Sequence, residues 1–114
     1  MEREEILIQN IKEFLRAGRR EKNDDSFNSA ATLFFKAIAV LADLFILKKE
    51  RYIPSSHTER FRLLKEKYPF IYEILDKDFP IYQDSYRLKI SEQLVGVLEN
   101  DFKKIVEFTK IKID

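Results

Sequence analysis

Apolar side chains recur along most of this chain at the three- and four-residue spacings of amphipathic helices. A helix expected over about residues 2–21 places four of them on one face: Leu7, Ile11, Phe14 and Leu15. The next segment, from about residue 26 to 50, is apolar almost all round. That pattern is typical of the central helix of a bundle, and its alanines would let neighbouring helices approach closely.

Proline and serine residues divide the second half of the chain. Pro54 ends the apolar segment, because proline has no amide proton and disfavours helical geometry in the residue before it. Ser56 and Glu59 have the spacing of a capping box, which predicts a third helix up to about residue 67. Pro69 marks a restart, and Pro80 is expected to open a separate short segment.

Ser91 is the expected cap of a last helix. The buried stripe of this helix would comprise Val95, Leu98, Phe102, Ile105 and Val106. Gly96 lies inside the same helix at a cost of about 1 kcal/mol relative to alanine, which suggests a close helix crossing. These elements predict an all-α protein, an antiparallel up-and-down bundle of four to five helices.

The length and charge of the chain set limits on its function. Its 114 residues suit one domain, residues 1–114, and a hydrophobic fraction of 45% argues against disorder. Lys and Arg number 21 against 20 Asp and Glu, so any nucleic-acid site must be a local patch. The absence of cysteine excludes thiol catalysis, and abundant Lys, Glu and Ile suggest a thermophilic source.

The N-terminal sequence MEREEILIQN is charged where a secretory signal would be apolar, so a cytoplasmic location is expected. Residues 30–47 are the most membrane-like stretch, but Lys36 and Asp43 lie inside it. A charge near a bilayer centre costs about 2.5–3.5 kcal/mol, so a helix buried in a bundle is favoured and no membrane association is expected. The same two residues share a face, either as a polar edge or as partners across a dimer interface.

The stretch RYIPSSHTER holds the single histidine, His57, six residues after Arg51. A histidine with a pKa near about 6.5 can serve as a general base, and an arginine can stabilise charge on a scissile phosphate. The alternative is a surface or packing histidine in the first turn of a capped helix. One histidine without cysteine makes a metal site improbable, and no phosphate-loop or dinucleotide motif implies a cofactor.

Two further groups are candidates for ligand binding. Basic residues that include Arg60 flank the Pro54 loop and would form a positive face around His57, able to hold phosphate, unless they merely solvate helix ends. Tyr82 and Tyr86 are one helical turn apart and precede Arg87. Such a group suits base stacking and phosphate contact, although packing against the bundle would also explain it.

The order of these features resembles the HEPN family of small prokaryotic helical proteins over nearly the whole chain. The resemblance lies in the long helix SAATLFFKAIAVLADLFILKK, the loop IPSSHTERF, the segment YQDSYRLKIS and the final helix SEQLVGVLENDFKKIVEF. It implies a helical bundle that often dimerises and often partners a minimal nucleotidyltransferase in a toxin–antitoxin pair. A catalytic subset of the family cleaves RNA without metal, using an arginine and a histidine four to six residues later.

No histidine follows Arg87 in the corresponding C-terminal segment, and the Arg51–His57 pair spans Pro54. The resemblance therefore implies a non-catalytic HEPN-like module that forms a homodimer and binds nucleotide, RNA or a minimal nucleotidyltransferase. Its expected ligand-binding residues are Arg51, His57, Arg60, Tyr82, Tyr86 and Arg87. The alternative is a metal-independent ribonuclease toxin that uses Arg51 and His57.

Overall fold

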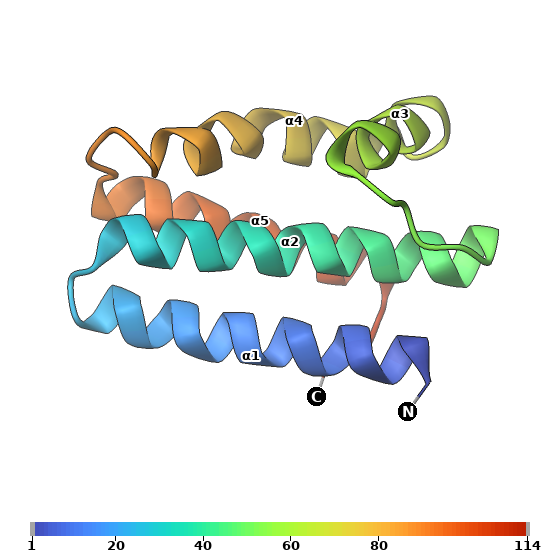
Figure 1. Ribbon diagram of the computed structural model, residues 1–114, viewed down its shortest axis with the longest axis horizontal. Helices are drawn as coiled ribbons and strands as arrows, with labels where there is room; N and C mark the ends of the chain where they lie inside the picture. Colours follow the sequence, from blue (N-terminus) through green and yellow to red (C-terminus); the bar gives the residue numbers. More distant parts are fainter. Residues whose placement is uncertain (1, 114) are drawn as a thin grey trace.

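A computed structural model describes residues 2–113, and this part of the chain folds into five α-helices with no strand (Figure 1). The helices are α1 (Arg3–Asn23), α2 (Phe27–Glu50), α3 (His57–Lys67), α4 (Pro69–Asp84) and α5 (Glu92–Thr109). The four longest helices, α1, α2, α4 and α5, alternate in direction along the chain, and α3 is a short helix between α2 and α4. The predicted all-α up-and-down bundle is confirmed.

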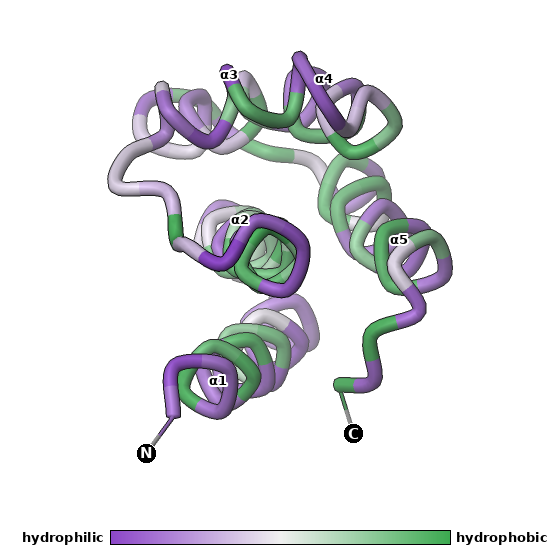
Figure 2. The backbone as a smooth tube through the Cα atoms, turned by 90° about the vertical axis from the view of Figure 1, so that its right-hand side faces the viewer, coloured by the Kyte–Doolittle hydropathy of each residue, from purple (hydrophilic) through white to green (hydrophobic). Residues whose placement is uncertain are grey.

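The centre of the bundle is α2, which packs against α1, α4 and α5 (Figure 2). Its buried side chains come from nearly every face of the helix, including Phe34, Ile38 and Leu44. By length and composition α2 alone among the described helices resembles a membrane span, but most of that stretch is buried inside the protein. The expected central bundle helix therefore accounts for its apolar character.

The flanking helices bury the faces predicted for them. Ile11 and Leu15 of α1 are buried, and Leu7 and Phe14 pack at the edge of the core. In α5 the buried stripe is Val95, Leu98, Phe102 and Ile105, while Val106 is partly buried. Ser91 caps α5 as predicted, because its Oγ accepts a hydrogen bond from the backbone N–H of Leu94 at 3.2 Å.

Pro80 does not open a separate segment, which corrects the prediction made from its sequence position. It lies inside α4, which continues to Asp84. Pro80 and Asp76, whose carbonyl would accept the missing hydrogen bond, are both exposed. Water can satisfy that carbonyl, so the helix continues past the proline without burying an unpaired group.

The close helix packing predicted at Gly96 is found at the other glycine, Gly18. A Cβ on Gly96 would meet no atom within 4 Å, so the predicted close crossing at Gly96 is wrong. A Cβ on Gly18 would lie 2.9 Å from the ring of Phe34. The backbone of α1 at Gly18 therefore packs directly against this side chain of α2. Only a residue without a side chain leaves room for that ring.

Candidate functional site

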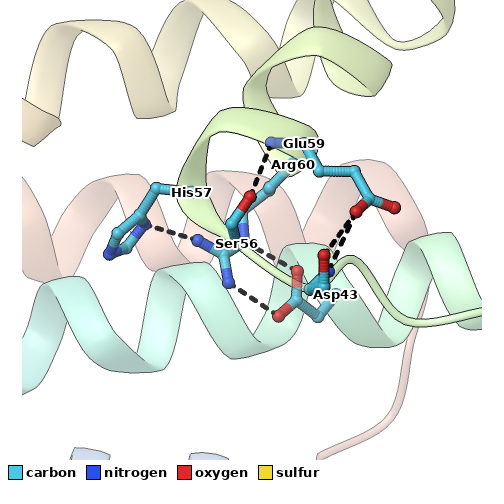
Figure 3. A network of polar contacts seen from close by, with 6 residues as sticks. Asp43, Ser56, His57, Glu59 and Arg60 are labelled. Carbon is cyan, nitrogen blue, oxygen red and sulfur yellow. Dashed lines mark hydrogen bonds and ion pairs between the residues drawn. The ribbon is translucent and has the colours of Figure 1, made fainter.

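The candidate site begins at the corner between α2 and α3, where Ser56 starts α3 (Figure 3). The Oγ of Ser56 accepts a hydrogen bond from the N–H of Glu59 at 3.1 Å, which is half of the predicted capping box. The carboxylate of Glu59 turns to Ser55 instead, accepting from its hydroxyl at 2.6 Å and from its N–H at 3.3 Å. The corner is therefore held by two serines and one glutamate.

Arg60, on the first turns of α3, is tied to Asp43 of α2. Its Nε and Nη2 donate to the two carboxylate oxygens of Asp43 at 2.7 and 2.8 Å, a bidentate pair (Figure 3). The Arg60 side chain is only 11% exposed, and that of Asp43 10%. Arg60 is consequently a structural link between α3 and the central helix, and its charge is already compensated.

The third guanidinium nitrogen of Arg60 holds His57. Nη1 lies 2.6 Å from Nδ1 of the imidazole. A guanidinium can only donate, so Nδ1 must accept, and the neutral ring carries its proton on Nε2. Burial and then the charge of Arg60 lower the pKa of His57 below 6.5, against an opposing effect of Asp43. His57 is therefore a neutral hydrogen-bond donor at neutral pH.

His57 joins a row of aromatic rings from α2 and α4. Its ring centroid lies 5.3 Å from that of Phe79 and 6.2 Å from that of Tyr82. Tyr82 in turn stacks on Phe35 of α2, with centroids 5.0 Å apart and an interplanar angle of 26°. Because Phe35 is buried, it fixes the inner end of the row in the core.

Tyr86 forms the outer end of this row. Its hydroxyl lies 3.0 Å from that of Tyr82, and its ring meets the ring of Tyr82 edge to face at 5.7 Å. Tyr86 is 69% exposed, the largest exposed fraction among the exposed large hydrophobic residues of the described chain. One ring edge is thus positioned by Tyr82 while much of the ring surface faces solvent.

Asn28 of α2 fixes the segment that carries Tyr86. Its side-chain amide donates to the carbonyls of Ser85 at 2.9 Å and Leu88 at 2.5 Å, and its Oδ1 accepts from the N–H of Ile90 at 3.0 Å. The hydroxyls of Thr32 and Ser85 lie 2.9 Å apart and add a second link. The connection between α4 and α5 is therefore a fixed corner on the end of α2.

The structure brings together His57, Arg60, Tyr82 and Tyr86 of the residues predicted for the site. Arg87 is exposed next to Tyr86 and has no ion pair among the described residues. Arg51 lies elsewhere: it ends α2 with φ of 70° and lines a hollow with Glu2, Arg3, Glu4 and Leu47. No hydrogen bond joins Arg51 to His57 among the described residues.

Several residues of the site were not predicted from the sequence, among them Phe79, Asn28 and Asp43. Phe79 and Asn28 carried no signal beyond ordinary helix residues, because their roles depend on contacts across 22 to 62 positions of the chain. Asp43 did carry a signal, as an acid inside an apolar helix, and its partner is Arg60 of the same chain. Lys36, which shares its face, is exposed and lies 5.9 Å from the ring of Phe14.

Within residues 2–113 no group of three or more His, Cys, Asp or Glu side chains is arranged to hold a metal ion. Comparison with protein-family models, with curated proteins and with solved structures finds no match to this chain.

Proposed function

We propose that this protein is a binding module for single-stranded RNA or a nucleotide, and that it holds this ligand at the Tyr86 corner without cleaving it. The observation that carries the proposal is Tyr86, a residue that is 69% exposed while its hydroxyl and ring edge contact Tyr82. An exposed aromatic ring in a fixed position costs little entropy when a base stacks on it. The HEPN-like order of the sequence supports the same class of ligand.

Charges around the ring suit a phosphate. Arg87 and Lys89 are exposed on the same corner and take part in no ion pair among the described residues. Arg60, by contrast, has both of its outer nitrogens and its Nε engaged by Asp43 and His57. In the proposed complex Tyr86 stacks on a base, Arg87 and Lys89 contact the backbone, and Arg60 only maintains the site.

The geometry of His57 favours binding over cleavage. A general base needs a free lone pair, and the lone pair of neutral His57 on Nδ1 already accepts from Arg60 at 2.6 Å. The proton on Nε2 makes the ring a donor, suited to a phosphate or carbonyl oxygen. Arg51, the proposed partner in a ribonuclease, lines a different hollow. These two features support the non-catalytic module over the alternative, a ribonuclease that uses Arg51 and His57.

The binding test uses fluorescence anisotropy with a short labelled single-stranded RNA, and competition by ATP. Tyr86→Ala is expected to weaken binding about tenfold or more, since one stacked base contributes about 1–3 kcal/mol. Phe70→Ala is the matched control, because Phe70 is 42% exposed at the opposite end of α4. Equal affinity of wild-type and Tyr86→Ala protein, or no binding of either ligand, would refute the proposal.

A separate assay distinguishes binding from cleavage. Labelled RNA is incubated with the protein and a metal chelator between about pH 5 and pH 8, the range in which histidine changes charge. Intact RNA throughout is the expected result. Cleavage that disappears in His57→Ala, with an unchanged circular dichroism spectrum, would replace this proposal with the ribonuclease.

A further inference from the structure

We infer that a groove between α1 and α5 binds a small anionic amphiphile, meaning an aliphatic chain that carries a carboxylate or phosphate group. The groove involves none of the residues assigned to the Tyr86 corner. It has a volume of about 600 Å³ and is lined by α1, α5 and the C-terminal residues 111–113. A second hollow of about 350 Å³ adjoins it and shares Leu15, Arg19 and Ile113.

The packing of the bundle explains why a groove forms there. Both α1 and α5 pack on α2, but they are not among the helix pairs that pack extensively on each other. Figure 2 shows the chain after α5 running towards α1, on the side of α2 where α5 lies. Ile111 and Ile113 of this tail pack against the core, so the tail narrows the gap between the helices without filling it.

The floor of the groove is aliphatic. It consists of Leu15, Val106, Ile111 and Ile113, with the buried ring of Phe102 beneath. No exposed aromatic ring is present on which a base could stack, so the groove is unsuited to a nucleotide. An apolar hollow of several hundred Å³ with polar groups at its edge is typical of small-molecule sites. The floor therefore selects an alkyl chain.

The rim of the groove is positively charged. Arg19 is neutralised by Glu99, whose carboxylate lies 3.2 Å from Arg19 and 3.0 Å from Lys22. The remaining lining charges are basic at Lys12, Arg16, Lys103 and Lys112, against one acid, Glu107. None of these four basic residues takes part in an ion pair among the described residues. The basic rim selects an anionic head group.

The test is isothermal titration calorimetry below the micelle concentration of each probe. Dodecanoate and dodecyl phosphate are compared with dodecyltrimethylammonium, which has the same chain and the opposite charge. Both anions are expected to bind at least about tenfold more tightly than the cation, because the unpaired basic side chains of the rim attract an anionic head group and repel a cationic one. Equal binding of anions and cation, or binding of no probe, would overturn the inference.

Variants then locate the site. Arg16→Glu with Lys103→Glu is expected to weaken dodecanoate binding about tenfold or more. Lys12→Glu with Lys112→Glu is an independent pair on the same rim, should the first pair misfold. Arg62→Glu with Lys65→Glu on α3 makes the same charge change elsewhere and should leave affinity unchanged. If the α3 pair weakens binding equally, or both rim pairs leave it intact, the groove is not the site.

Two more measurements distinguish amphiphile binding in the groove from RNA binding at the Tyr86 corner and from binding to a membrane surface. Tyr86→Ala should retain full dodecanoate affinity, so loss of RNA binding and loss of amphiphile binding remain distinguishable. Sedimentation with vesicles of anionic phospholipid tests whether the basic rim instead meets a membrane surface. Binding to vesicles without binding to monomeric dodecanoate would contradict a groove that encloses single molecules.

Discussion

Two buried aspartates of this protein, Asp43 on α2 and Asp78 on α4, differ in how their carboxyl groups are compensated for the loss of water. Asp43 is buried, and both of its carboxylate oxygens accept hydrogen bonds from the guanidinium group of Arg60. Asp78 is fully buried, and neither of its oxygens accepts a hydrogen bond from a donor within residues 2–113. The nearest cation, Lys77, lies 3.4 Å from Asp78 but 2.7 Å from Asp101 of α5.

The two residues differ in the donors that reach them: Arg60 donates to both carboxylate oxygens of Asp43, whereas no donor of the described residues bonds to Asp78. Burial raises the pKa of Asp78 to about 8, and the neighbouring Asp101 carboxylate adds to this effect. Burial alone would also raise the pKa of Asp101, but its contacts with Asp78 and Lys77 lower it. Asp78 thus retains its proton at neutral pH, while Asp101 carries the charge that Lys77 and Lys104 balance.

The largest expected effect comes from breaking the bidentate pair of Arg60 and Asp43. Arg60→Met leaves Asp43 buried without a partner and should lower the free energy of unfolding by about 3–5 kcal/mol. Urea denaturation followed by circular dichroism measures this change. The double variant Asp43→Leu with Arg60→Met should recover most of the loss, because no unpaired charge remains. A double variant no more stable than Arg60→Met would contradict this account.

The second effect concerns the proton on Asp78. Between pH 3.8 and about 8 the folded protein keeps a proton that the unfolded chain releases, so this residue makes the free energy of unfolding fall as pH rises. The slope is at most about 1.4 kcal/mol per pH unit. Asp78→Asn removes the titration and should be more stable than wild type at pH 8 by more than about 1 kcal/mol.

The measurement is a set of urea denaturations of both proteins across this pH range. The relevant quantity is the difference between the two, because His57 titrates in the same range with the opposite sign. A difference that does not grow with pH would show that Asp78 is ionised in the folded protein.

A smaller effect tests the Arg60–His57 contact by NMR. The pKa of His57 should lie below 6.5, and nitrogen chemical shifts at neutral pH should show the proton on Nε2. Arg60 lowers this pKa more than Asp43 raises it. Asp43→Leu with Arg60→Met should therefore raise the pKa of His57. A wild-type value at or above 6.5 would be inconsistent with the contact.

The smallest effect is expected at an exposed ion pair on α3. Arg62 and Glu66 lie one helical turn apart at 3.7 Å, and both side chains are 59% exposed. Glu66→Ala should change the free energy of unfolding by less than about 0.5 kcal/mol in urea denaturation. A loss of unfolding free energy comparable with that of Arg60→Met would show that burial does not explain the difference between the Arg60–Asp43 and Arg62–Glu66 pairs.

Local patterns predicted the helices well, because spacing, caps and prolines act over a few residues. Ser56, Ser91 and Pro69 mark helix starts where the structure has them. Pro80 and Gly96 misled because their effects depend on whether the surroundings are exposed or packed, which local sequence does not reveal. Only the assembled fold distinguishes Gly96, in open space, from Gly18 against Phe34.

The candidate site was predictable in its residue types but not in its connections. Tyr82 and Tyr86 were identified together because their spacing of four residues is local. Arg60 pairs with Asp43, 17 positions earlier in the chain. Because its guanidinium is engaged by this pair, Arg60 is not free to bind a phosphate. Arg51 and His57 are near in sequence, but the turn at Pro54 separates their contacts.

The bonds of Asn28 also bear on the order of folding. Each joins positions 57 to 62 residues apart, so none can form before the C-terminal half of the chain has docked on α2. The helices can nucleate from local contacts, but the Tyr86 corner requires the assembled bundle. Partly folded chains will therefore contain helix without a formed Tyr86 corner, and the ligand binding proposed for that corner should report on the completion of folding rather than on its start.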